Sequence, residues 1–460
     1  MNLPVTRLKA FLFKGGRPWS PVFVVFGLVM FLGLFCSPAF AGNIADREVP
    51  GNGLTVLHAE KSTLPIIKVF VLVKAGSVNE PADKAGLANL TADLLNEGTV
   101  RRTAKEISEQ IEFVGGSLSS SGGQDYAMLS LSVLKKDLDL GLDLLSDIIL
   151  NPVFSEAEIS RRKTVIKSAI IQQKEDPGTV ASKAFQKAVF GEHPYSRPVE
   201  GDEDSIDRIT RQDILDFHRT YYLPNNSIMA VVGDISKAEL RAALDKYLGG
   251  WQQKPLAQKP LPAPANIGGR RVIKINKDIT QSNIILGHLG ITRDNPDFYA
   301  VQVMNYILGG GGFASRLMDN IRDNKGLSYN VHSQFSAGKY SGSFMAGLQT
   351  KNISATIAIE ELLREMNRII TEPLSDKELS DAKSYLTGSF PLRIDSNSKL
   401  AGMLVQIEFN NLGLDYVDNY RKFIDAVSKD DVLRVAKKYL NTKDYVLVVV
   451  GDLAKANLPY

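Results

Sequence analysis

The sequence repeats itself, and the repeat limits the folds that are open to it. Near the end of the first half, "NSIMAVVGDISKAEL" reads as a buried strand, a Gly-Asp turn and the start of a helix, and "KDYVLVVVGDLAKANL" has the same order near the C-terminus. Earlier, "ILNPVFSEAEISRRKTVIKS" from Ile149 matches "IITEPLSDKELSDAKSYLTG" from Ile369. Two matches in register indicate an internal duplication, and the chain is expected to fold as two similar units.

A segment without periodic apolar residues separates the two copies. It begins at Trp251, "WQQKPLAQKPLPAPANIG", and is rich in Pro, Gln and Ala, a composition typical of a linker. The boundaries that follow are an N-terminal domain over 42–250, a Pro-rich linker over 251–268 and a C-terminal domain over 269–460. Each domain has about 200 residues, an ordinary size for one core.

Strand patterns alternate with amphipathic helix patterns in the first half. "LPIIKVFVLVKAGS" and "YAMLSLSVLK" read as strands, whereas helices are predicted over 85–96, over 104–114, in "DLDLGLDLLSDIIL" and over 156–174. This grouping predicts an α+β fold of two homologous domains, each a mostly antiparallel sheet covered by helices.

The first 41 residues have a character of their own. Four basic residues precede the apolar run "VFVVFGLVMFLGLFC" and the segment "SPAFAG", which is the layout of a secretory signal peptide cleaved after Ala41. A retained anchor is the alternative, but 15 apolar residues fall short of the roughly 20 that a spanning helix needs. Bulky Phe35 disfavours a lipid-attachment site at Cys36. We expect a periplasmic or secreted protein without stable membrane insertion.

Cleavage at that point changes the charge balance and the thiol content. Residues 1–41 hold four of the 54 basic residues and none of the 51 acidic ones, so the mature part has 50 against 51. This near-neutral balance gives no indication of nucleic-acid binding. The single cysteine also leaves with the segment, so the mature chain has neither disulfides nor a nucleophilic thiol.

Local catalytic motifs are scarce. No two of the five histidines lie within five residues of each other, and a lone histidine is most often a hydrogen-bonded structural residue. The glycine-rich run from Leu308 to Leu317 lacks the Gly-Lys-Ser/Thr ending of a phosphate loop. It is expected to be a tight backbone passage into a helix beginning near Ser315. A Gly-x-Ser-x-Gly elbow is also missing from the sequence.

The predicted helix over 85–96 has two faces of different character. Its apolar residues, such as Leu87 and Leu90, recur at helical spacing and predict a core-facing side. On the other side Asn89 and Asp93 stand four apart with Ala92 between them, a spacing at which side chains converge on one point.

Five stretches carry a family resemblance: "AGSVNEPADKAGLANL", "GTVRRTAKEI", "FGEHPYSRPVEG", "YYLPNNSIMAVVGD" and "LGGGGFASRLMDNIRDNKGLSYNV". Through them the chain resembles the pitrilysin-type peptidases, particularly the mitochondrial-processing-peptidase branch and its bacterial relatives, over essentially the whole mature length. The resemblance implies two domains of similar fold around a peptide-holding cleft. Catalytic members carry His-x-x-Glu-His on the early helix of the first domain, where two histidines bind zinc, the glutamate acts as general base and a downstream glutamate completes the ligands.

Aligned through Gly98-Thr99, the family's zinc motif falls on Asn89, Ala92 and Asp93. An amide and a carboxylate give zinc little in place of two imidazoles, and Ala92 supplies no base. The window for the third ligand falls near 167–170, "KSAI", which contains no acid. We therefore expect no cofactor on this chain. A hard cation held by Asn89, Asp93 and Glu97 is the alternative, but calcium needs six to eight oxygens, and a solvated capping role is expected for these residues instead.

The resemblance also singles out Arg322 and Tyr329, which stand seven apart in "IRDNKGLSY". In catalytic relatives an Arg and a Tyr at this spacing reach across the cleft to the substrate beside the zinc. Both side chains are donors that can hold a peptide carbonyl and stabilise an oxyanion. The shared strand parity of Tyr329 with Val331 and Phe335 favours a core tyrosine instead, and the resemblance favours the functional role.

These expectations describe one subunit of a heterodimeric peptidase that is inactive alone. A homologous partner with an intact His-x-x-Glu-His motif would bind zinc, while Arg322 and Tyr329 position the peptide substrate in trans. The peptide would add as a strand to a sheet edge, for which Gly115 to Gly123 is a candidate, although its Gly and Ser residues also suit an ordinary mobile edge. The main alternative is a non-catalytic structural or peptide-binding core-type protein of the same fold. An independently active hydrolase is disfavoured by the missing nucleophile and metal ligands.

Overall fold

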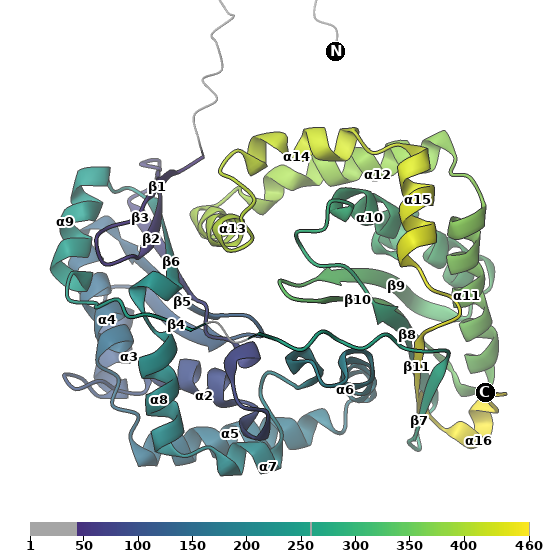
Figure 1. Cartoon of the computed structure of the whole chain (residues 1–460), viewed down its shortest axis with the longest axis horizontal. Helices are drawn as coiled ribbons and strands as arrows, with labels where there is room; N and C mark the ends of the chain where they lie inside the picture. The colour runs from purple at the N-terminus through teal and green to yellow at the C-terminus, as the bar shows by residue number, and fades with distance from the viewer. Residues whose placement is uncertain (1–43, 258–259, 460) are drawn as a thin grey trace, which may run out of the picture. The chain divides into compact units, whose positions relative to one another are not determined.

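Two β-sheets with corresponding strand orders organise the chain (Figure 1). The computed structural model describes residues 44–257 and 260–459, so the predicted signal peptide lies outside the described residues. The first sheet has the order β1-β2-β6-β3-β5-β4 and the second the order β7-β11-β8-β10-β9. The strands are β1 (Asp46–Glu48), β2 (Thr55–Glu60), β3 (Ile66–Val73), β4 (Ser117–Gly122), β5 (Ala127–Leu134), β6 (Ser227–Gly233), β7 (Arg271–Asn276), β8 (Gln281–Leu289), β9 (Ser328–Ala337), β10 (Gly342–Lys351) and β11 (Val446–Gly451).

The pairing directions also correspond between the two sheets. β2 pairs with β6, and β7 with β11, in parallel, whereas the remaining neighbours run antiparallel. β6 and β11 are buried along their whole length, which explains their unbroken runs of apolar residues. The predicted α+β fold with two similar, mostly antiparallel sheets is confirmed.

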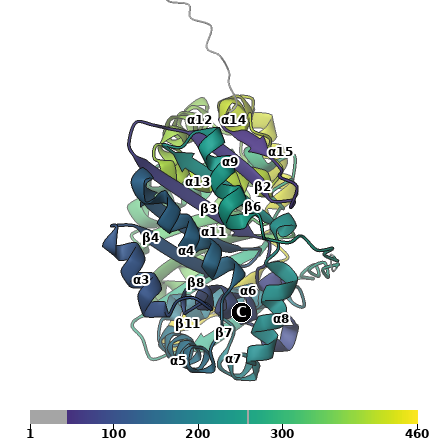
Figure 2. The same cartoon turned by 90° about the vertical axis from the view of Figure 1, so that its left-hand side faces the viewer.

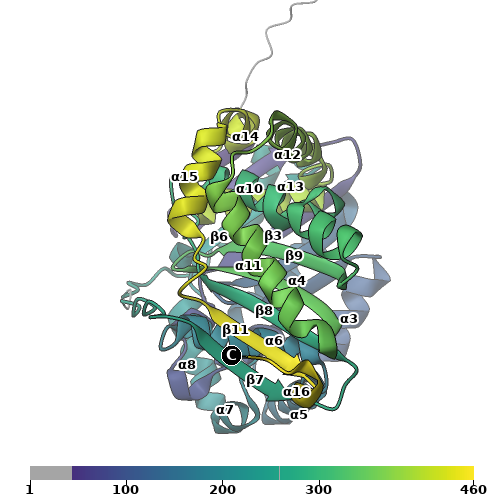
Figure 3. The same ribbon diagram turned by 90° about the vertical axis from the view of Figure 1, so that its right-hand side faces the viewer.

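Helices cover one face of each sheet, which we call its outer face. Figure 2 shows α3, α4 and α9 over the first sheet, and Figure 3 shows α10 and α11 over the second. The helices of the first half are α2 (Leu87–Asp93), α3 (Ala104–Phe113), α4 (Leu138–Leu150), α5 (Glu156–Gln173), α6 (Pro177–Phe190), α7 (Glu203–Arg208), α8 (Arg211–Tyr221) and α9 (Lys237–Leu248). Those of the second half are α10 (Phe298–Asn305), α11 (Ala355–Thr371), α12 (Asp376–Ser389), α13 (Asn397–Phe409), α14 (Tyr416–Asp425), α15 (Lys429–Tyr439) and α16 (Leu453–Ala456).

Each half lends one helix to the sheet of the other half. α6, from the first half, packs on β8 and β11, and α13, from the second half, packs on β3 and β6. The two helices follow α5 and α12, which carry the repeated sequence, so they occupy equivalent positions in the two copies. They cover part of the face opposite the outer helices, which we call the inner face. An amphipathic pattern shows that a helix packs on a core but not on which one, so the sequence did not reveal this exchange.

Both sheets end in a strand with one free side, β4 in the first and β9 in the second. β4 lies inside the glycine- and serine-rich stretch predicted to form an edge. Unpaired edge groups are able to accept a further strand. Within the described parts of the chain, none of the helices combines the length and the apolar character needed to cross a bilayer.

Candidate functional site

The helix on which the family's zinc motif falls, with all three of its functional positions changed, is short and firmly anchored. Gly86 has φ +96° and opens α2, and the buried carboxylate of Glu80 accepts hydrogen bonds from the backbone N–H groups of Gly86 (3.1 Å) and Ala88 (3.0 Å). A carboxylate at a helix N-terminus satisfies orphan donors and complements the helix dipole. Burial outweighs these bonds and raises the pKa of Glu80 to about 7.

Asp93, at the second histidine position, is neutralised by an arginine from α5. Its Oδ2 lies 2.7 Å from Nη2 and 3.1 Å from Nε of Arg162, and only 11% of its side chain is exposed. The Asn89 amide nitrogen lies 3.5 Å from the same oxygen, and Ala92 is fully buried. Burial raises the pKa of Asp93, and Arg162 opposes that shift. The predicted solvated capping role is therefore wrong, because an ion pair between α2 and α5 occupies the position.

The side chains next to Asp93 offer a metal ion no free ligands either. Glu97 pairs with Arg161 at 2.7 Å, and Lys167, in the window for the third ligand, pairs with Asp207 at 2.7 Å. Among the described residues no three His, Cys, Asp or Glu side chains gather as a metal site. The donors present therefore fit neither zinc nor a hard cation.

Four of the five histidines take structural roles, as expected. Nε2 of His58 and of His218 each lie 2.9 Å from a backbone carbonyl, of Ile235 and Ile149. Ring nitrogens of His193 and His288 accept backbone N–H groups, of Tyr195 at 3.1 Å and of Asn441 at 3.0 Å. Burial lowers the pKa of His218 to about 4, which keeps that imidazole neutral at pH 7.

The glycine-rich run is a tight backbone passage, as predicted. It forms a π-helical turn (Tyr306–Gly310) and a 3₁₀ turn (Gly312–Ala314), and helical structure resumes after Ser315. A Cβ atom at Gly309 would lie 2.6 Å from the Leu317 side chain and from the backbone of Ser333, so the close approach requires glycine. The passage leads into the π-helical segment η9 (Met318–Asn324), which carries Arg322.

Arg322 lies between two exposed aromatic rings. Its guanidinium carbon is 4.5 Å from the ring centre of Phe313 and 4.9 Å from that of Tyr329. Phe313 is 73% and Tyr329 86% exposed. The nearest carboxylate, of Asp323, is 3.9 Å from Nε, and the guanidinium donates no hydrogen bond to another described residue. Contact with the two rings does not use the N–H donors of the guanidinium, so these donors stay available.

A β-bulge explains why Tyr329 is not a core residue. Leu348 of β10 pairs with Val331, but Thr350, two residues on, pairs with Ser328, three residues back. The extra residue in β9 breaks the alternation, so Tyr329 does not share the buried side of Val331. The core prediction that followed from strand parity alone is wrong, and Tyr329 points to solvent.

An ion-pair cluster fixes the segment that carries Arg322. Glu361 of α11 accepts hydrogen bonds from Asn320 (2.7 Å) and Lys325 (2.5 Å), one on each side of Arg322 in the sequence. Arg364 lies 2.6 Å from the same carboxylate. Burial would raise the pKa of Glu361, but Lys325 and Asn320 outweigh it and the pKa is lowered. These bonds tie η9 to α11 and limit where the guanidinium can move.

The sequence analysis did not identify three residues that contact these sites. Arg162 contacts the zinc-motif positions on α2, whereas Phe313 and Glu361 support the segment with Arg322. The sequence held a signal for Arg162. Asp93 stands where the family motif has a neutral histidine, so its negative charge needs a nearby cation, and Arg162 lies close to the acid-free window at 167–170. A signal also existed for Phe313, because a bulky aromatic between Gly312 and Ala314 has little to pack on. The sequence held no such signal for Glu361 of α11, because its hydrogen-bond partner Asn320 lies on η9, far away in the sequence.

Comparisons with known proteins agree over almost the whole described chain. The model of the insulinase family (peptidase family M16) matches residues 55–203, and that of the peptidase M16 inactive domain matches residues 208–386. An uncharacterized zinc protease of Mycobacterium leprae is 29% identical over 92% of this chain and 95% of its own. The uncharacterized zinc protease YmxG of Bacillus subtilis is 26% identical over 89% and 98%.

Solved structures share the fold. The crystal structure of a peptidase M16 inactive domain from Pseudomonas fluorescens is 30% identical, with a TM-score of 0.83 over 88% of this chain and 98% of its own. A protease from Helicobacter pylori, at 24% identity, superposes with a TM-score of 0.81 over 88% and 99% of the two chains.

Proposed function

Because this chain belongs to the peptidase M16 family of insulinase and pitrilysin-like proteins, we propose that it is the non-zinc-binding subunit of a heterodimeric peptidase. A homologous partner with an intact His-x-x-Glu-His motif carries the metal centre and the general base. This chain lends Arg322 and Tyr329 to the peptide or unfolded polypeptide that is cleaved there. Alone, it is inactive.

One observation carries the proposal: Arg322 and Tyr329 are held together with donors that the described residues leave unused. The Arg322 guanidinium donates no hydrogen bond to another described residue, and the ring of Tyr329 stacks on it while standing 86% exposed. A guanidinium and a phenol both donate hydrogen bonds, so the pair is able to hold a peptide carbonyl. As water attacks that carbonyl, negative charge develops on its oxygen, and donors placed beforehand stabilise it.

The positions on α2 where relatives carry the zinc motif also support the assignment of metal binding to the partner and of peptide positioning to this chain. Asp93 is committed to Arg162, and Ala92 has no proton acceptor to offer. The chain therefore needs a second subunit to supply the metal and the base. We also propose that the protein acts outside the cytoplasm after cleavage behind Ala41, and the intact mass of the mature protein tests that point.

Replacement of Tyr329 by phenylalanine tests the proposal most cleanly. Tyr329→Phe removes only the hydroxyl and keeps the ring that stacks on Arg322. In a complex reconstituted with the partner, turnover is expected to fall about 10²- to 10³-fold, the usual effect of losing one oxyanion donor. Tyr385→Phe is the matched control, because Tyr385 is also an exposed tyrosine of the same half, at 57%, and it should leave turnover unchanged.

Assembly with the partner must be measured beside turnover. The proposal predicts an intact complex with low activity for Tyr329→Phe. An intact complex with wild-type turnover would contradict it and favour the alternative, a structural or peptide-binding protein of the same fold.

A further inference from the structure

The inner faces of the two sheets carry matching strips of neutral side chains. On the first sheet, three cross-strand pairs of β4 and β5 face inward, and on the second, three pairs of β9 and β10 do so. Their side is fixed by the register, because the alternate pairs, such as Leu118 with Leu131 and Phe335 with Phe344, pack into the outer cores. The strips consist of Ser117–Ser132, Ser119–Ser130 and Ser121–Met128, and of His332–Gly347, Gln334–Met345 and Ser336–Ser343.

None of these positions holds a charged residue, in a chain that is 23% charged. Seven serines, one glutamine, two methionines and one glycine are neutral at every physiological pH. The remaining residue of the list is His332, whose pKa is lowered by burial, so its imidazole is neutral at pH 7 as well. The repeated choice of hydroxyl, amide and thioether groups on both copies therefore gives two surfaces without fixed charge.

Charged groups border the strips but form no part of them. Lys68 of β3, beside Ser132 in the register, is the neighbouring cation, and burial lowers its pKa. At the second strip, Lys183 of α6 pairs with Glu200 at 2.7 Å, and Asp176 caps α6 by accepting from the Thr179 N–H at 2.7 Å.

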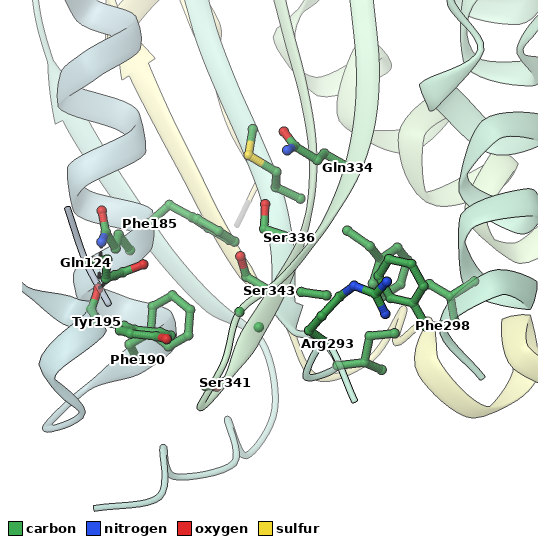
Figure 4. Close-up of a pocket in the computed structure, with 18 of the residues that line it drawn as sticks. Gln124, Phe185, Phe190, Tyr195, Arg293, Phe298, Gln334, Ser336, Ser341 and Ser343 are labelled. Carbon is green, nitrogen blue, oxygen red and sulfur yellow. Dashed lines mark hydrogen bonds between the residues drawn. The ribbon is translucent and has the colours of Figure 1, made fainter. Parts of the chain in front are cut away.

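The second strip forms the wall of two adjoining cavities beside α6. One, of about 580 Å³, is bordered by Gln334, Ser336 and Ser343, and the other, of about 550 Å³, by His332 and Gly347. Met345 and two residues of α6 border both. In Figure 4, Phe185 reaches from α6 toward Ser336 and Ser343.

Arg293 also borders the larger cavity but from the side of the outer helices. Its guanidinium carbon lies 3.7 Å from the ring centre of Phe298, on which it stacks (Figure 4). The cavity wall formed by the strip itself is therefore free of charge and offers hydroxyl and amide groups.

We propose that the two neutral strips hold extended, uncharged segments of the substrate and so restrict this subunit to polypeptides of low charge. The inference rests on the proposed function, since it takes the occupant to be the peptide that is cleaved. Hydroxyl and amide side chains both donate and accept hydrogen bonds, which matches the groups of a peptide backbone. A charged side chain placed on such a surface loses water and gains no counter-charge.

The strips adjoin the two free strand edges, β4 and β9. A segment added to such an edge turns every second side chain to the inner face, where it meets the strip. Met128 and Met345 give each strip one adaptable apolar contact. Small polar or apolar side chains therefore fit, and binding through these groups does not depend on salt.

Binding of unstructured peptides by the purified protein tests the inference without requiring catalysis. The probes are a fluorescent twelve-residue peptide of Ser, Gln and Val and two versions with four Lys or four Glu substituted in. We expect the neutral peptide to bind about tenfold more tightly than either charged one, with an affinity that stays the same between 50 and 300 mM NaCl.

Charge introduced into a strip should change the preference. Gln334→Glu and Ser130→Asp are each expected to raise the affinity for the Lys-containing peptide about tenfold and to make it fall with added salt. Gln252→Glu, the same chemical change at an exposed position of the linker segment, is the matched control and should leave every affinity unchanged. Circular dichroism confirms that the three variants are folded.

Three results would overturn the inference: equal or tighter binding of a charged peptide, no binding of any of the peptides, or no response to the strip variants. None of them bears on the donor role of Arg322 and Tyr329. That role is tested separately by turnover of the Tyr329→Phe complex, so a complex that needs Tyr329 but cleaves Lys-rich and neutral peptides equally well would refute the strips alone.

Discussion

The family resemblance singles out two sites, the zinc-motif positions on α2 and the pair of Arg322 and Tyr329, and their side chains are used in opposite ways. On α2, Asp93 is buried and its charge is cancelled by Arg162 from α5. On η9 and β9, Tyr329 is 86% exposed and Arg322, whose side chain is 24% exposed, contacts its ring without an ion pair shorter than 3.9 Å. A carboxylate in a buried position without its metal must find another partner, because an unpaired buried charge is costly. Donors that reach solvent face no such demand, so their retention points to a use outside the chain.

The largest effect should come from removing the guanidinium of Arg322. Arg322→Ala is expected to lower turnover of the reconstituted complex about 10²- to 10³-fold, or roughly 3 to 4 kcal/mol of transition-state stabilisation. Thermal stability should change little, since no described residue depends on its donors. Arg421→Ala, at an exposed arginine of α14, is the control for loss of a surface charge. Equal turnover in the two variants would remove the contrast between the two places.

Breaking the buried pair should cost stability instead of activity. Arg162→Met leaves Asp93 without its partner, and we expect a loss of about 2 to 3 kcal/mol in the free energy of unfolding, below the full cost of a buried pair because Arg162 is 31% exposed. Urea denaturation measures it. Arg161→Met is the control on the same helix, since Arg161 is 49% exposed and pairs at the surface, and it should cost under about 1 kcal/mol.

A double variant sharpens this result. Asp93→Leu together with Arg162→Met replaces both charges by apolar groups, so stability should return to within about 1 kcal/mol of the wild type. If Arg162→Met alone proved neutral, the pair of Asp93 and Arg162 would not stabilise this part of the fold.

A smaller effect is expected from the ring on the other side of Arg322. Phe313→Leu removes one stacking face and should lower turnover about tenfold through looser placement of the guanidinium, whereas Phe313→Tyr keeps the face and should have little effect. Nitrogen-selective NMR of the Arg322 side chain gives a readout independent of activity. Its ring-current shift should shrink in Phe313→Leu and persist in Phe313→Tyr. Equal shifts in both variants would show that Phe313 does not place Arg322.

The smallest effect concerns the pH dependence of the two halves. In the second half, burial of Glu378 is outweighed by Arg316, at 2.6 Å, and by the Ser375 backbone, so that its pKa lies at about 2. A folded-state pKa below the unfolded value gives stability that is present above the ordinary Glu pKa and is lost as pH falls toward 2. Glu80 in the first half, with a pKa of about 7, acts in the opposite direction, since its folded form prefers the proton.

Glu378→Gln should therefore lower stability by about 1 kcal/mol at pH 7, after allowance for solvent screening, and by nothing measurable near pH 2. Melting curves of wild type and variant at the two pH values measure the difference. A constant difference at both would show that the Arg316 pair does not titrate in this range.

Much of the fold was predictable because it depends on local patterns. The two β-Gly-Asp repeats, the strand alternation of β5 and the helices α4 and α5 lie where apolar periodicity places them. The exchange of α6 and α13 was not predictable, since both helices present an apolar side that suits either sheet. For the candidate site, too, local features could be predicted and features that depend on long-range pairing could not. The loss of the zinc motif could be read from Asn89, Ala92 and Asp93, but the bulge that turns Tyr329 outward depends on the pairing of β9 with β10.

The central claim is that this chain binds no zinc at α2 and contributes Arg322 and Tyr329 to a site whose metal the partner holds. The measurement is equilibrium dialysis of the purified protein against zinc, followed by elemental analysis and by an assay with unstructured peptides. Since Asp93 is paired with Arg162 and the described residues gather no set of three ligands, we predict zinc well below one ion per chain and no cleavage by the chain alone. One tightly bound zinc per chain, together with peptide cleavage in the absence of a partner, would contradict the account.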